Sequence, residues 1–180
     1  TTRPMVADKR VREAMNIAIN RADIVKGIML GQADPAYTFI DPKALDFADS
    51  TKNDWLAVSQ LWLAGELHSR RTDVVLFVNG IPLVLAEFKE PNKSAKAAYD
   101  ENITDYRDTI PALFVPNGFV ICSNGSEAKV GSTYAPWEYF GDWKVIDNDG
   151  HRGVVALDTA IRGTCAQDRL LDMIENFVAY

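Results

Sequence analysis

The chain has 180 residues, of which 47% are hydrophobic and 24% are charged, and this balance excludes a disordered or fibrous chain. Nineteen basic residues against twenty-five acidic ones give a net charge of −6, which argues against a broad electrostatic surface for DNA or RNA. No apolar run approaches the roughly 20 residues of a membrane span. We therefore expect a cytoplasmic protein without a membrane partner, with Cys122 and Cys165 as reduced thiols.

The N-terminal third of the chain has three predicted elements. Apolar residues spaced three and four apart predict one amphipathic helix over about 8–30, with a potential break near Asp23. The polar stretch that follows predicts loops around a short strand at Tyr37–Ile40. The apolar-rich run Trp55–Leu63 predicts a single strand that ends at Ala64-Gly65.

A β-hairpin is the strongest local prediction. Two β-rich runs flank Asn79-Gly80, a dipeptide typical of tight hairpin turns. We place the two strands at Val74–Val78 and Pro82–Lys89.

The rest of the chain is predicted to form both helices and strands. We expect a helix over about 94–108 with Ser94 as its N-cap, strands at Phe119–Ser123 and Lys129–Thr133, and a helical segment over 155–180. The apolar stripe of that last segment consists of Leu170, Leu171, Ile174, Phe177 and Val178. Together with the hairpin, these helices and strands are compatible with the α/β class.

Charged side chains interrupt the second strand of the hairpin. Because side chains alternate along a strand, Glu87 and Lys89 point to the same face. A three-residue turn over 79–81, or a β-bulge, would place Asp73 opposite Glu87, whereas a regular two-residue turn would place it opposite Ala86. We expect the first arrangement, with the two carboxylates facing each other.

Two facing carboxylates and a lysine suggest a particular chemistry. Close carboxylates raise each other's pKa unless a cation lies between them, and Mg²⁺ is the natural choice for oxygen ligands. The predicted metal ligands are Asp73 and Glu87. Lys89 would orient or deprotonate a water, or stabilise negative charge on a phosphate oxygen. Together these groups suit phosphodiester hydrolysis.

The string from Asp73 to Glu87-Phe88-Lys89 resembles the D…E-x-K core of the PD-(D/E)xK nucleases. Together with its neighbours, from about Asp46 to Lys144, it resembles the N-terminal nuclease domain of the R subunit of type I restriction-modification enzymes. The resemblance implies a restriction-endonuclease-like core in which helices flank a central mixed sheet. It also implies Mg²⁺-dependent cleavage of double-stranded DNA by Asp73, Glu87 and Lys89.

The resemblance also implies supporting residues and partners. The family's Q-x-x-x-Y motif corresponds to Asn102 and Tyr106, four apart on one helix face. Arg70 and Arg71 precede the strand and could contact phosphates. The expected partners are the methyltransferase and specificity subunits, and ATP would be used by a motor domain outside this chain, which itself has no Walker-type P-loop.

Residues 1–154 would form the nuclease domain, and 155–180 would be a helical segment leading to the motor. Two alternatives stay open. The chain could be a non-catalytic docking domain of the same complex, or a repair or junction nuclease of the same superfamily. The carboxylates and lysine of the E-x-K strand favour the restriction nuclease.

Overall fold

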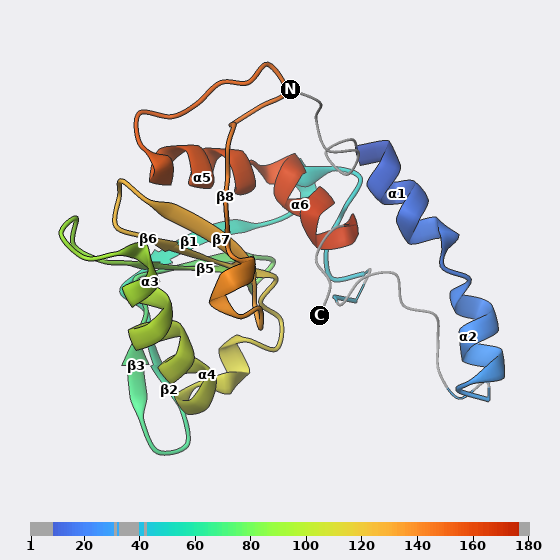
Figure 1. Ribbon diagram of the computed structural model, residues 1–180. Helices are drawn as coiled ribbons and strands as arrows, with labels where there is room; N and C mark the ends of the chain where they lie inside the picture. Colours follow the sequence, from blue (N-terminus) through green and yellow to red (C-terminus); the bar gives the residue numbers. More distant parts are fainter. Residues whose placement is uncertain (1–8, 31, 33–39, 42, 177–180) are drawn as a thin grey trace.

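The computed structural model describes residues 9–30, 32, 40–41 and 43–176, and its centre is a six-stranded mixed sheet (Figure 1). In spatial order the strands are β1 (Trp55–Ser59), β4 (Val74–Val78), β5 (Ile81–Phe88), β6 (Phe119–Ser123), β7 (Ala128–Ser132) and β8 (Gly141–Asp142). β5 and β6 are parallel, and every other neighbouring pair is antiparallel. This architecture confirms the expected α/β core with a mixed sheet.

Helices cover both faces of the sheet (Figure 1). On one face, α3 (Ala95–Ala98), η3 (Tyr99–Ile103) and α4 (Thr104–Thr109) follow one another without interruption. Ser94 is the N-cap of this helix, as predicted, and the middle segment η3 is a π-helical turn. Side chains from these helices share a core with Val75, Leu85 and other residues of the sheet.

The opposite face carries α5 (Ala156–Thr164) and α6 (Gln167–Asn176). The segment predicted to be helical forms two helices within the described residues, because the chain breaks at Cys165-Ala166. Both helices share a core with the sheet. Of the predicted stripe, Leu170, Leu171 and Ile174 are buried there, and the other two residues lie outside the described residues. The predicted division between a nuclease domain (1–154) and a segment that leads to a motor domain (155–180) stays a prediction.

The N-terminal helix is also divided. It consists of α1 (Lys9–Ala18) and α2 (Arg21–Gly27), so the chain breaks a few residues before Asp23, close to the predicted position. The reason is a cap: the Asn20 side chain accepts a hydrogen bond from the Asp23 N–H at 3.2 Å and so begins a new helix. The predicted short strand falls mainly outside the described residues, and its last residue, Ile40, is a bend.

The predicted strand over residues 55–63 is wrong as a single element. β1 ends at Ser59, and β2 (Trp62–Ala64) leaves the sheet to pair with β3 (Ser69–Arg71) in a two-stranded ribbon. Gln60 causes the change of direction with a φ of +54°, a conformation that nonglycine residues seldom adopt. Its backbone N–H donates to the Asp73 carbonyl at 2.8 Å, which ties the base of the ribbon together.

The register of the hairpin depends on a β-bulge. The turn is a two-residue Asn79-Gly80 turn, with Val78 paired to Ile81, so the alternative of a three-residue turn is wrong. The pairing then shifts by one residue, leaving Leu83 as the extra residue of β5. From there Val74 pairs with Ala86, which sets Asp73 opposite Glu87 as expected.

Three short 3-10 helices complete the described structure: η2 (Ser50–Lys52), η4 (Pro111–Leu113) and η5 (Trp137–Tyr139). Within the described residues, no helix has both the length and the apolar character needed to cross a membrane. Both cysteines are free thiols, and Cys122 is buried within the sheet.

Candidate functional site

Two hydrogen bonds between side chain and backbone link Asp73 to Glu87 and Phe88, at the point where β4 begins and β5 ends. The Asp73 backbone N–H donates to Glu87 Oε1 at 2.9 Å, and the Phe88 N–H donates to Asp73 Oδ2 at 2.8 Å. Each carboxylate therefore binds the backbone of the opposite strand, which fixes its position. The Gln60 amide donates to Asp73 Oδ1 at 3.2 Å and adds a third support.

Glu87 is the electrostatically strained member of the pair. Its side chain is 1% exposed, and burial raises its pKa to about 8, with a further rise from the charge of Asp73. Once Glu87 is ionised, the two carboxylates together offer oxygen ligands to a cation. These donors fit a hard divalent metal ion, which would offset both the burial and the repulsion.

Lys89 lies on the same side of β5 as Glu87, as predicted, and contacts the covering helix. Its side chain is only 14% exposed, and its ammonium group lies 2.5 Å from Glu101 Oε2 on the π-turn η3. The hydrogen bond from Lys89 lowers the pKa of Glu101. The lysine is therefore ordered beside the carboxylate pair by a partner on another element.

Asn102 and Tyr106 lie behind Glu87 and connect to one another. Asn102 Nδ2 donates to Tyr106 Oη at 3.2 Å, and that hydroxyl donates to the Arg71 carbonyl at 2.8 Å, with Glu87 Oε2 3.5 Å away. Burial, with the nearby charge of Glu87, raises the pKa of Tyr106 to about 12, so the hydroxyl keeps its proton. Asn102 Oδ1 is buried and has no hydrogen-bond partner among the described residues.

The structure separates the two arginines. Arg70 faces α4, where its Nη2 donates to Asp105 Oδ1 at 2.9 Å and its Nε to Oδ2, and this contact lowers the pKa of Asp105. Arg71 is exposed on the other face of the ribbon, with its guanidinium 6.0 Å from the centre of the Trp62 ring. Only Arg71 is placed to meet a large ligand without breaking an ion pair.

Two residues that surround the carboxylates were missed in the sequence. Gln60 gives no signal, because its role depends on a positive φ and on the ribbon that follows it. Glu101 carries a weak signal, since it directly precedes Asn102, which the family motif marks. Neither contact follows from spacing along the chain alone.

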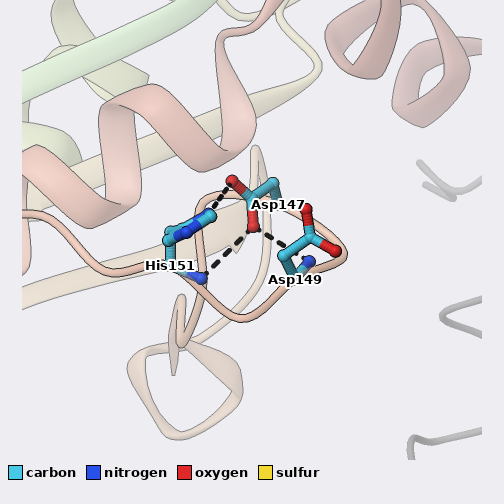
Figure 2. Close-up of side chains that lie close together, drawn as sticks. All are labelled: Asp147, Asp149 and His151. Carbon is cyan, nitrogen blue, oxygen red and sulfur yellow. Dashed lines mark hydrogen bonds and ion pairs between the residues drawn. The ribbon is translucent and has the colours of Figure 1, made fainter.

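A second acidic cluster lies in the loop between β8 and α5 (Figure 2). Asp147 Oδ1 accepts from the N–H groups of Asp149 and His151 at 3.0 and 3.2 Å, and Asp147 Oδ2 lies 2.6 Å from His151 Nδ1. The bond to His151 is the main cause that lowers the pKa of Asp147. These turn contacts account for the cluster, and its exposed position contrasts with that of Glu87.

The sequence of this chain matches the model of one known protein family. The family described as "Type I restriction enzyme R protein N terminus" matches residues 20–139, two thirds of the chain. This chain belongs to that family. The matched residues include Asp73, Glu87 and Lys89, so the R protein N-terminal family covers the whole carboxylate and lysine arrangement. Nuclease families of this kind point to a divalent metal.

Two curated relatives of this R protein N-terminal chain are endonuclease subunits. A Methanocaldococcus jannaschii protein assigned as the type I restriction enzyme MjaIXP endonuclease subunit is 29% identical over 161 residues. The type I restriction enzyme HindI endonuclease subunit of Haemophilus influenzae is 33% identical over 146 residues. Each alignment covers 77% of this chain but only 15% and 14% of the relatives, so the chain corresponds to a small part of each.

Proposed function

We propose that this chain supplies the DNA-cleaving site of a type I restriction enzyme R subunit, with Asp73, Glu87 and Lys89 as its catalytic residues. The observation that carries the proposal is the buried Glu87 carboxylate, cross-bonded to Asp73 and flanked by the ordered Lys89. A purely structural strand has no use for such a group, because its burial opposes the charged form.

Each residue has a distinct part in this proposal. Asp73 and Glu87 would hold Mg²⁺, which supplies Lewis-acid polarisation of the scissile phosphate when bound. Lys89 would donate to a phosphate oxygen or orient the attacking water, after it exchanges Glu101 for the substrate. Tyr106 and Asn102 would hold Glu87 and the Arg71 carbonyl in place from behind.

The relatives support a proposal for the wider setting of this chain. Because the chain spans about 15% of relatives that are type I endonuclease subunits, we propose that it acts in the cytoplasm within a complex with methyltransferase and specificity subunits. ATP-driven translocation by another domain would deliver double-stranded DNA. The metal-binding experiment described next also tests the alternative of a non-catalytic docking domain, since such a domain has no need of metal.

We expect Mn²⁺ or Mg²⁺ to raise the melting temperature of this chain, because an ion that binds only the folded state stabilises it. Asp73→Asn and Glu87→Gln should each abolish the shift. The measurement is a thermal unfolding series across metal concentrations. Asp147→Asn is the matched control, since it removes one carboxylate from the other acidic cluster. If Asp147→Asn abolishes the shift and the other two variants keep it, the metal site has been misplaced.

Without its partner domains, the chain should bind duplex DNA weakly at physiological ionic strength. A net charge of −6 opposes phosphate approach, and screening over a Debye length of about 8 Å lets only a local basic surface compensate. Nonspecific affinity comes essentially from phosphate contacts, so we expect a Kd weaker than about 1 µM. Fluorescence anisotropy with labelled duplex measures it. Submicromolar binding would contradict this account of DNA delivery.

A further inference from the structure

The β2–β3 ribbon has two unlike faces. Paired residues of an antiparallel ribbon share a face, so Leu63 and Arg70 lie on one side, and Trp62 and Arg71 on the other. The first side packs inward: Leu63 joins the core beneath the helices, and Arg70 binds Asp105. We call the second side, Trp62, Ala64, Ser69 and Arg71, the outer face.

The ribbon is held tightly against α4. A Cβ at Gly65 would lie 1.9 Å from the Thr109 carbonyl oxygen, so the backbones approach too closely for any other residue. The Gly65 N–H also donates to the His68 carbonyl at 2.8 Å, which closes the turn. The outer face is therefore presented by a fixed element.

The outer face and the tip of the ribbon each expose a large apolar side chain. Trp62 is 68% exposed and Leu67, at the tip, is 87% exposed. The guanidinium of Arg71 lies over the Trp62 ring, and the acidic residue of the ribbon, Glu66, lies at the turn beside Leu67 and not on the outer face. Arg71 precedes Asp73 by two residues, so their Cα atoms lie within about 7 Å of each other.

We infer that the outer face of the β2–β3 ribbon and its Leu67 tip contact duplex DNA beside the phosphate that is cleaved. Arg71 bonds a backbone phosphate, Trp62 packs on the deoxyribose next to it, and Leu67 enters the adjacent groove. A two-stranded ribbon fits a DNA groove, and exposed leucines at such tips can act as wedges. The inference rests on the proposed function, because it makes duplex DNA the ligand of this surface.

DNA fits this surface for electrostatic reasons. The domain as a whole is acidic, so a polyanion is held only where local charge is positive or neutral. The outer face combines a cation, an indole and a hydroxyl within one short ribbon. Arg70, which points the other way into its ion pair with Asp105, makes no such contact.

Variants of the ribbon test the inference by anisotropy with a labelled duplex at low ionic strength, with Ca²⁺ in place of Mg²⁺ to prevent cleavage. We expect Trp62→Ala to weaken binding by about tenfold, as for the loss of an aromatic contact to nucleic acid, and to leave the salt dependence unchanged. Arg71→Ala should weaken binding and reduce the slope of log K against log salt by about 1. Leu67→Ser should weaken binding to duplex with unchanged slope.

Matched controls separate these effects from loss of charge or of apolar surface. Arg162→Ala removes an exposed arginine from α5, on the opposite face of the sheet, and Tyr139→Ala removes an aromatic residue that is 72% exposed on η5. Both should bind like the parent chain. The inference is overturned if the parent chain shows no binding at low salt, or if the ribbon variants bind like the controls. Metal-induced stabilisation that persists in the ribbon variants would leave the proposed function standing in either case.

Discussion

Lys89→Ala in the full-length R subunit, assembled with its partners, is expected to lower DNA cleavage by about 10³-fold, the scale seen when one charge-stabilising donor is removed from an active site. ATP hydrolysis and translocation should continue, because the proposed motor lies outside this chain. The reason is local. The Lys89 ammonium is 14% exposed and ordered by Glu101 beside the carboxylate pair, so its removal leaves charge on the phosphate without a partner. Plasmid cleavage and ATPase assays on the same preparation measure both activities.

Lys129→Ala is the matched control for this experiment. Lys129 also lies on a strand of the sheet and also forms an ion pair, with Asp142 at 2.8 Å. Its replacement should leave cleavage unchanged. Loss of ATPase activity in Lys89→Ala, with cleavage retained, would show that the chemistry has been assigned to the wrong residues.

Glu87→Gln should make the metal-free chain more stable at pH above 8 while it abolishes metal binding. Below pH 4.5 the Glu87 carboxyl is neutral in both the folded and unfolded states, so the variant and the parent should be equally stable. Between 4.5 and about 8 the unfolded parent loses this proton and the folded parent keeps it, so its free energy of unfolding falls as pH rises. The glutamine is neutral throughout and avoids the loss.

The expected gain in the free energy of unfolding is about 2 kcal/mol above pH 8. This is a conservative fraction of the free energy that a rise in the Glu87 pKa from 4.5 to about 8 implies. Glutamine keeps an acceptor for the Asp73 N–H, so the local bonding is preserved. Urea unfolding in the presence of a chelator, repeated across pH, gives the free energies. Glu138→Gln, an exposed change of the same kind, should show no comparable gain. If the parent chain is more stable than Glu87→Gln above pH 8, burial does not destabilise the charged form of Glu87.

Local sequence was sufficient for the elements that depend on neighbours along the chain. Asn79-Gly80 adopts the positive φ values that a tight hairpin turn needs, and these residue types tolerate them. Val74–Val78 and Phe119–Ser123 became strands at the predicted bounds, because β-branched and apolar residues suit a buried sheet. Ser94 begins the helix after β5 as expected.

Local sequence failed where a distant contact decides the backbone. Nothing within Trp55–Leu63 reveals that Gln60 turns the chain out of the sheet, because the turn is held by Asp73, thirteen residues later. By contrast, the split of the N-terminal helix was predicted to within a few residues, because the Asn20 cap that begins the second helix is a local contact.

The sequence by itself determined the spacing of Asp73, Glu87 and Lys89, the residues that we propose carry the chemistry. Only the tertiary structure decided how they meet. The extra residue Leu83 shifts the hairpin register so that the two acids oppose each other. The fold likewise pairs Lys89 with Glu101 and turns Arg70 away to Asp105. A one-residue shift reverses the faces of a strand, and contacts between separate elements are set by packing, so neither can be derived from composition or period.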